Sequence, residues 1–203
     1  MIFFRVSAAL LLAGPVFAAS PLDKKVTLQA SAGLEIETIC RVSGLPCAIE
    51  LDSSVWSVPR ARAPFRVQDE TVAAALSRAI LLYHGHRWRW RKGVIYVTPN
   101  APISGSPLDR TLARKDFDMS LDDARAEFGV KAGFCSPPVG RASTSPGPKK
   151  KVKVSFALAG ESTPRAALNA LVLRLGRAAW LVESSPPSGG RSIFCLDLVD
   201  YDD

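Results

Sequence analysis

The sequence contains few of the residues that usually build a metal centre or a catalytic site. Among its 203 residues are only two histidines and four cysteines, and no Cys-x-x-Cys pair occurs. The usual zinc spacing and the dithiol redox motif are therefore both missing. The chain also lacks a Gly-x-Ser-x-Gly elbow, a phosphate-binding loop and a Gly-x-Gly-x-x-Gly motif. We expect a protein with no enzymatic activity, no metal and no cofactor.

The two histidines, His84 and His86, are the one local arrangement that resembles a metal site. On a strand, a His-x-His pair places two ligands on one face. A metal site needs a third and usually a fourth ligand, and no nearby residue has the required spacing. His84 is expected at the end of a helix, where a cation is favourable, so we favour a structural role. The acidic pair Asp122-Asp123 is likewise better explained by the first turn of a helix than by acid-base catalysis.

Long hydrophobic runs are missing except at the start of the chain, "MIFFRVSAALLLAGPVFAAS". This segment has one early cation, an apolar run and small residues around Ala18, as expected of a secretory signal peptide that is cleaved there. The alternative is a membrane anchor, but the run is short and Gly14-Pro15 interrupts it. Every later apolar run is broken by arginine or lysine. We therefore expect an exported protein with no integral membrane segment after cleavage.

Export affects how the four cysteines are interpreted, because thiols in an oxidising compartment usually form disulfides. Four cysteines allow three connectivities, and their number does not choose among them. The turn after Cys40 is expected to bring Cys47 back along the preceding helix, which favours a Cys40–Cys47 bridge. Cys135 and Cys195 would then form the second bridge. The alternative is that Cys40 points into the core as a free thiol.

Positive charge exceeds negative charge and gathers in two short segments. The chain carries 26 basic and 19 acidic residues, a net charge of +7, which becomes +6 once residues 1–18 and their single cation Arg5 are removed. Such charge runs are most often solvated surface, although they also suit anionic partners. The candidate partner-binding residues are Arg87, Arg89, Arg91, Lys92, Lys149, Lys150, Lys151 and Lys153.

The first basic segment lies in "HRWRWRKGVIYV", residues 86–97, which has the pattern of a β-hairpin. Side chains alternate between the two faces of a strand, so Trp88 and Trp90 share one face and the arginines share the other. If Lys92-Gly93 is a two-residue turn, Trp90 lies opposite Ile95 and Trp88 opposite Val97. We expect the tryptophans to face the core and the arginine face to be available for binding.

An internal repeat organises the chain. "FRVQDETVAAALSRAILLYHGHRW" (65–88) and "FALAGESTPRAALNALVLRLGRAAW" (156–180) both run from a β-like stretch through an amphipathic helix to glycine and tryptophan. We expect Asp69 to cap the first helix, Thr163 to precede the second, and Gly85 and Gly176 to end them. The preceding segments repeat more faintly, as strand, helix, glycine and cysteine.

These features predict an α+β protein of two small βαββαββ-like units, each with two helices packed on small mixed or antiparallel sheets. The expected units span residues 24–99 and 113–200, with a linker at 100–112 after the signal peptide at 1–18. In the second unit, Ser120 and Asp123 form a capping box at a helix start. Residues 136–151, "SPPVGRASTSPGPKKK", are expected to be a disordered insertion, and "SSPPSGG" (184–190) to join the last two strands.

The segment from Leu34 to Trp90 resembles the short N-terminal domain shared by secretins and TonB-dependent outer-membrane receptors. The resemblance rests on "VSGLPCAIELD" and "VQDETVAAALSRAILLYHG", and "LAGESTPRAALNALVLRLG" is similar to the later part of the same pattern. In that family the domain usually precedes a barrel or a ring-forming region, and the sequence leads us to expect no such region here. The resemblance implies a degenerate tandem pair of these domains, located in the bacterial periplasm, that docks onto envelope proteins through its sheet edges and faces.

Two functions are therefore considered. The first is a non-enzymatic interaction module or adaptor that binds an envelope protein such as a secretin, a receptor or a regulator. The second is binding of an anionic polymer, namely nucleic acid, polysaccharide or lipid headgroups, through the basic hairpin and the lysine-rich segment. A steep loss of binding with added salt would indicate the second function, because phosphate contacts release counterions.

Overall fold

The computed structural model describes residues 19–53, 63–129, 134, 152–160, 162–188 and 191–201, which form an α+β fold. The predicted signal peptide and the predicted insertion at 136–151 lie outside these ranges. The elements, in chain order, are η1 (Pro21–Asp23), β1 (Lys25–Ala30), α1 (Glu35–Ser43), β2 (Cys47–Asp52), β3 (Phe65–Thr71), α2 (Val72–Ile80), β4 (His86–Arg91), β5 (Val94–Pro99), η2 (Pro107–Asp109), β6 (Asp116–Met119), α3 (Leu121–Phe128), β7 (Val154–Ala157), α4 (Pro164–Leu175), β8 (Ala178–Ser188) and β9 (Arg191–Asp200).

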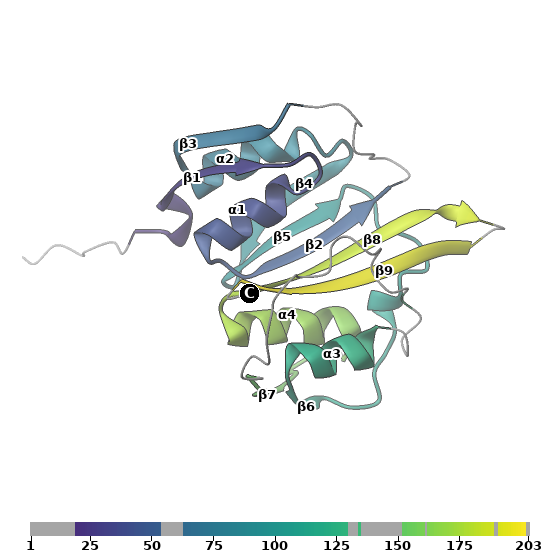
Figure 1. Cartoon of the computed structure of the whole chain (residues 1–203). Helices are drawn as coiled ribbons and strands as arrows, with labels where there is room; N and C mark the ends of the chain where they lie inside the picture. Colours follow the sequence, from purple (N-terminus) through teal and green to yellow (C-terminus); the bar gives the residue numbers. More distant parts are fainter. Residues whose placement is uncertain are drawn as a thin grey trace, which may run out of the picture.

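One five-stranded sheet runs through the middle of the molecule, in the order β4-β5-β2-β8-β9 (Figure 1). β2 pairs in parallel with β5 on one side and with β8 on the other, whereas the hairpins β4–β5 and β8–β9 are antiparallel. Two further antiparallel ribbons, β1–β3 and β6–β7, lie outside this sheet. Strands from both halves of the chain thus share a single sheet, rather than forming separate small sheets.

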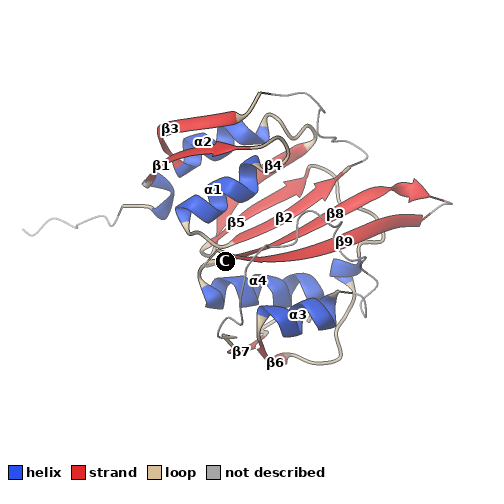
Figure 2. Cartoon of the chain, viewed as in Figure 1, coloured by secondary structure: helices blue, strands red, loops and turns tan. Residues whose placement is uncertain are grey.

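Helices cover both faces of the central sheet (Figure 2). α1 and α2 lie on one face, beneath the β1–β3 ribbon, and α3 and α4 lie on the other face with the β6–β7 ribbon. This arrangement explains the composition of β2, "CAIELD", in which the first five residues are all buried. A strand that is covered on both faces has no solvent side, so its sequence does not alternate between apolar and polar residues.

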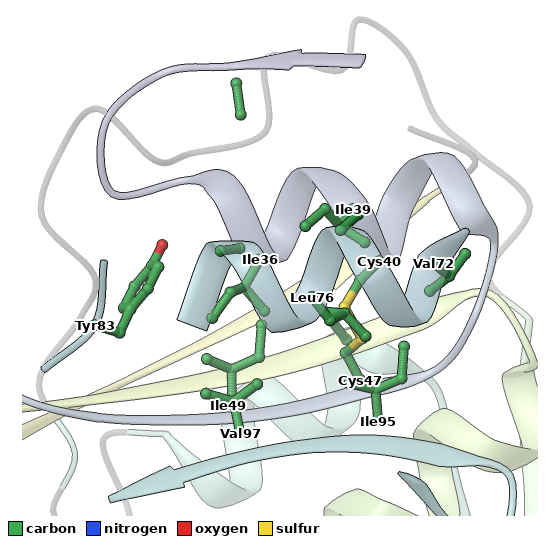
Figure 3. Close-up of a cluster of buried hydrophobic side chains, with 14 of the residues drawn as sticks. Ile36, Ile39, Cys40, Cys47, Ile49, Val72, Leu76, Tyr83, Ile95 and Val97 are labelled. Atoms are coloured by element: carbon green, nitrogen blue, oxygen red, sulfur yellow. A yellow bond between two sulfur atoms is a disulfide. The ribbon is translucent and has the colours of Figure 1, made fainter. Parts of the chain in front are cut away.

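Two hydrophobic cores lie on the two sides of the sheet. The first joins α1 and α2 to one face, and Figure 3 shows Ile36, Ile39 and Leu76 packed above Ile49 and Val97. The second core joins α3 and α4 to the other face, and its largest buried side chain is a tryptophan from β8. Members of the second core include Phe117, Phe128, Phe156, Leu168, Leu171, Trp180, Phe194 and Leu196. Within the described ranges, no helix has the length and hydropathy of a membrane span.

The ends of α2 differ from the sequence prediction. Thr71, not Asp69, caps this helix: its hydroxyl accepts a hydrogen bond from the Ala74 N–H, while Asp69 lies in β3 with a positive φ of 50°. The helix ends at Ile80, so Gly85 is not its cap; this glycine instead lies just before β4, with φ of 73°. The heptad-like spacing continues past Ile80, which explains why the pattern suggested a longer helix.

The other predicted helix ends are confirmed. Ser120 and Asp123 form the capping box of α3, and these hydrogen bonds lower the pKa of the Asp123 carboxyl from its ordinary value. Thr163 caps α4 immediately before a proline, and Gly176 ends it in the left-handed conformation.

The Cys40–Cys47 disulfide predicted from the sequence is present (Figure 3). Its Cα atoms are 6.3 Å apart, and both cysteines are buried where α1 packs on β2. Cys195 is also disulfide-bonded. Its predicted partner, Cys135, lies outside the described residues, so that pairing stays a prediction.

The last hairpin is longer than the sequence suggested. "SSPPSGG" was expected to be a connection, but β8 continues through Ser188 and pairs there with Arg191 of β9. The ladder is irregular between Ser185 and Ser188. Prolines are tolerated at such irregular or edge positions, because no ladder hydrogen bond is lost there.

The cores predict a ranking of tryptophan substitutions. Trp180 is 0% exposed and donates its indole N–H to the Asn169 Oδ1 at 3.0 Å, whereas Trp88 is only half-buried. Trp180→Ala should lower the free energy of unfolding by about 3–5 kcal/mol. Trp88→Ala should lower the free energy of unfolding by a smaller amount, about 1–3 kcal/mol. Arg89→Ala should change the free energy of unfolding by less than about 0.5 kcal/mol. Urea denaturation of the three variants tests the ranking, and a larger loss for Arg89→Ala would contradict it.

The short disulfide should stabilise the fold modestly. A bridge between residues seven apart in sequence closes a small loop, for which the chain-entropy relation gives about 2.5 kcal/mol. We expect the double variant Cys40→Ala, Cys47→Ala to lose about that amount in unfolding free energy under non-reducing conditions. Chemical denaturation measures the loss, and peptide mapping of the unreduced protein verifies the bridge. An unchanged unfolding midpoint would contradict the expectation.

Candidate interaction surface on the edge strand β4

The β4–β5 hairpin has the predicted register. Trp88 lies opposite Val97 and Trp90 opposite Ile95, and the two-residue turn is Lys92-Gly93, with φ of 50° and 81°. Positive φ at both turn positions is the geometry that matches the twist of a hairpin. The tryptophans pack against the first core, as expected, although both are half-buried rather than fully enclosed. The Trp88 indole N–H donates to the Ser77 Oγ of α2 at 3.3 Å.

Arg87, Arg89 and Arg91 lie on the opposite face of β4, and all three are exposed. Within the described ranges, none of the three forms an ion pair. The Arg89 guanidinium carbon lies 5.9 Å from the centre of the Tyr96 ring on β5. Burial raises the pKa of the Tyr96 hydroxyl, and the charges of Arg91 and Arg89 oppose that rise. The arginines thus form a positive row beside a partly buried aromatic side chain; we call these three residues the arginine row.

The backbone of β4 also offers hydrogen-bonding groups. β4 ends the strand order of the central sheet, so it has a neighbour on one side only. The Ile95 N–H donates to the Pro46 carbonyl at 2.9 Å, so the backbone groups of Ile95 point away from β4. The residues on either side of Ile95, Val94 and Tyr96, therefore direct their backbone groups toward β4. In the β4–β5 ladder they lie opposite Arg91 and Arg89. By the same alternation, the N–H and C=O groups of Trp88 and Trp90 point outward from the sheet.

At Leu198, side chains occupy the backbone groups of the other edge strand, β9. The Leu198 N–H donates to the Asp197 Oδ1 at 2.8 Å, and the Leu198 carbonyl accepts a hydrogen bond at 2.5 Å from Arg125 of α3. Proteins commonly protect edge strands in this way against unwanted pairing. For Trp88 and Trp90, no backbone hydrogen bond beyond the β4–β5 ladder is found in the part of the chain that the structure describes. The two edges therefore differ in accessibility.

Of the remaining predicted basic residues, the structure describes Lys92 and Lys153. Lys92 occupies the hairpin turn next to the row and is exposed. Lys153 lies just before β7, which lies on the same side of the sheet as α3 and α4 (Figure 1). The Lys153 Nζ is 3.6 Å from the Asp123 Oδ2. Lys149, Lys150 and Lys151 lie outside the described residues.

The His86 imidazole is held by two hydrogen bonds to the backbone. His86 is 8% exposed; its Nε2 accepts a hydrogen bond from the Asp52 backbone N–H at 3.0 Å, and its Nδ1 lies 2.9 Å from the His84 carbonyl. The imidazole thus joins the start of β4 to the end of β2, with its proton on Nδ1. Among the described residues, no group of three or more histidine, cysteine or acidic side chains is placed to hold a metal ion.

A buried ion pair beneath β2 is a feature that the sequence analysis missed. Glu50, only 6% exposed, pairs with Arg165 of α4, and Arg165 also contacts Asp109 at 3.0 Å. Burial lowers the pKa of the Arg165 guanidinium from its ordinary value. A glutamate inside the apolar strand "CAIELD" is a signal that a partner is needed, because an unpaired buried charge is costly. The sequence pattern does not indicate which arginine supplies it.

The histidine geometry predicts different effects for the two residues. His86→Ala removes the acceptor for the Asp52 N–H and should lower the free energy of unfolding by about 1–3 kcal/mol. His84→Ala keeps the backbone carbonyl and should change it by less than about 0.5 kcal/mol. Urea denaturation with and without added Zn²⁺ tests this. A zinc-dependent rise in the midpoint that is lost in His86→Ala would contradict the structural role.

Comparison of the chain with protein-family models, curated proteins and solved structures gave no match in any of the three. The resemblance to the short N-terminal domain of secretins and TonB-dependent receptors therefore rests on the residue pattern alone. Its functional implications enter below as part of a proposal, together with the geometry of β4.

Proposed function

We propose that this protein is an exported, non-enzymatic interaction module, an adaptor that docks onto a periplasmic assembly of the secretin or TonB-dependent receptor type. The observation that carries the proposal is the exposed edge strand β4 with its arginine row. Among the described residues, no strand pairs with the outer side of β4 and the arginine row forms no ion pair. Such an edge is a liability in a protein that never meets a partner, and it is a ready surface for docking.

The order of elements in the first half supports the family resemblance behind this proposal. β1, α1, β2, β3, α2 and the β4–β5 hairpin follow the strand, helix, strand, strand, helix and hairpin pattern. We further propose that the second half is a degenerate copy. In its support, β6–β7 corresponds to the antiparallel ribbon β1–β3, α3 and α4 correspond to α1 and α2, and each half ends in a hairpin.

The disulfide supports the proposed compartment. Buried cysteines that pair across α1 and β2 are expected in a protein that folds in an oxidising environment, such as the periplasm. A cleaved signal at residues 1–18 is part of the same proposal. Mass spectrometry of the protein from a producing cell should find an N-terminus at Ala19.

Site-specific photo-crosslinking tests the docking surface. A photoreactive amino acid at position 89, on the arginine row, should crosslink to an envelope protein in intact cells. The same probe at position 66, an exposed arginine on β3, is the matched control and should yield at least tenfold less product. Equal crosslinking from both positions, or none from position 89, would contradict the proposal.

Binding of an anionic polymer is the alternative that the crosslinks must separate. A nucleic acid, polysaccharide or lipid product from position 89 would overturn the adaptor proposal and favour the alternative. Salt gives a second criterion: polyanion binding should fall steeply and linearly with the logarithm of salt concentration, because each phosphate contact releases counterions. Docking that includes apolar and backbone contacts should depend on salt more weakly.

A further inference from the structure

We propose that β4 accepts an extended strand from the partner, with acidic residues at alternating positions and apolar residues between them. This inference rests on the proposed function and names the chemistry of the partner at the same surface. It combines the outward backbone groups of Trp88 and Trp90, for which no partner is found among the described residues, with the arginine row on one face and the half-buried tryptophans on the other.

The backbone determines the kind of segment that fits. The outward N–H and C=O groups of Trp88 and Trp90 are spaced as in any strand, so an added strand continues the central sheet by backbone hydrogen bonds. A helix or a compact turn cannot supply matching groups at that spacing. A proline-rich segment is also excluded, because proline has no N–H to donate.

The two faces of β4 determine the side chains of that segment. The arginines are two residues apart and lie on one face, so the neighbouring strand places every second side chain beside them. Carboxylates at those positions pair with guanidinium groups that have no ion-pair partner among the described residues. The intervening side chains lie beside Trp88 and Trp90, whose partial exposure leaves apolar surface to cover.

A second copy of the chain does not fit this edge. Antiparallel pairing of β4 with another β4 would place arginine beside arginine, and like charges on facing strands repel. Pairing with β9 is blocked at Leu198, whose backbone N–H and C=O are already occupied by Asp197 and Arg125. The charge and the hydrogen-bonding state of the two edges thus favour a different chain with an acidic face.

Synthetic peptides test the proposal without knowledge of the natural partner. The probe is an eight-residue peptide of alternating glutamate and valine, with blocked ends. A peptide of alternating glutamate and proline carries the same charge but lacks half of the backbone donors, and one of alternating glutamine and valine keeps the backbone but lacks the charge. Titration calorimetry on the mature, disulfide-bonded protein should show at least tenfold weaker binding for each control peptide.

Protein variants provide the matching controls. The triple variant Arg87→Gln, Arg89→Gln, Arg91→Gln should bind the glutamate-valine peptide at least tenfold more weakly. A second triple variant, Arg41→Gln, Arg66→Gln, Lys115→Gln, loses the same charge at exposed positions outside the β4–β5 hairpin and should bind unchanged. Thermal unfolding of both variants verifies that they are folded. An equal loss of peptide affinity in the two variants would mean that net charge alone causes the effect, and it would overturn the proposal.

Amide hydrogen exchange identifies the edge directly. On binding, the backbone N–H groups of Trp88 and Trp90 should exchange at least tenfold more slowly, while that of Arg89, which already lies in the β4–β5 ladder, should change little. Protection elsewhere, or equal binding of the proline peptide, would overturn strand addition. If strand addition fails in this way while position 89 still crosslinks to an envelope protein, the adaptor proposal stands. Failure of strand addition can therefore be told apart from failure of the adaptor proposal.

Discussion

The structure depends on the parallel pairing of β2 with β5 on one side and β8 on the other. This strand is the shared centre of the sheet, and its residues contribute to both hydrophobic cores: Ile49 faces α1 and α2, whereas Ala48 faces α3 and α4. Each hairpin attaches to β2 through one strand only, and no other described strand pairs with the remaining strand, β4 or β9, which is therefore a sheet edge. The arginine row lies at an edge because β5, and not β4, pairs with β2 and neither ribbon joins the sheet.

The two edges show different solutions to the same physical problem. An edge strand presents unpaired backbone groups and attracts other strands unless it is protected. On β9, side chains occupy the backbone groups of Leu198 directly. On β4, the outward backbone groups of Trp88 and Trp90 have no partner among the described residues, and the protection is electrostatic, because the arginine row repels another copy of itself. Electrostatic protection is selective, since it excludes a basic or identical strand while it attracts an acidic one.

Local features of this fold were predictable from the sequence, whereas the assembly of the sheet was not. The Lys92-Gly93 turn, the opposite faces of the tryptophans and arginines, the capping box at Ser120 and the Cys40–Cys47 bridge all depend on residues close in sequence. The error at Asp69 was also local, since Thr71, two residues later, is another favoured N-cap residue.

The residues that pair with β2 lie 48 positions later in the sequence on β5 (Cys47 with Ile95) and 132 positions later on β8 (Cys47 with Ala179). Nothing within "CAIELD" specifies which strands flank it. Its unbroken burial indicates only that both faces are covered. The edge position of β4, which makes the arginine row a candidate site, therefore could not be predicted from the hairpin alone. The same limit applies to Glu50 and Arg165, which are 115 residues apart.

Contacts with β2 and α4 hold the two ends of β4 in place, which lowers the conformational entropy that the strand loses when a partner docks. At its start, the His86 imidazole links the strand to the backbone of Asp52 at the end of β2. At its other end, the turn glycine Gly93 approaches α4 so closely that an added Cβ would lie 3.0 Å from the Leu173 Cδ1. Along its length, Trp88 and Trp90 pack against the first core. A strand held in this way has little conformational freedom left to lose when a partner binds, so more of the interaction free energy is retained as affinity. The residues that hold β4 in place thus contribute to binding without contacting the partner, and the arginine row can act as a preorganised set of charges.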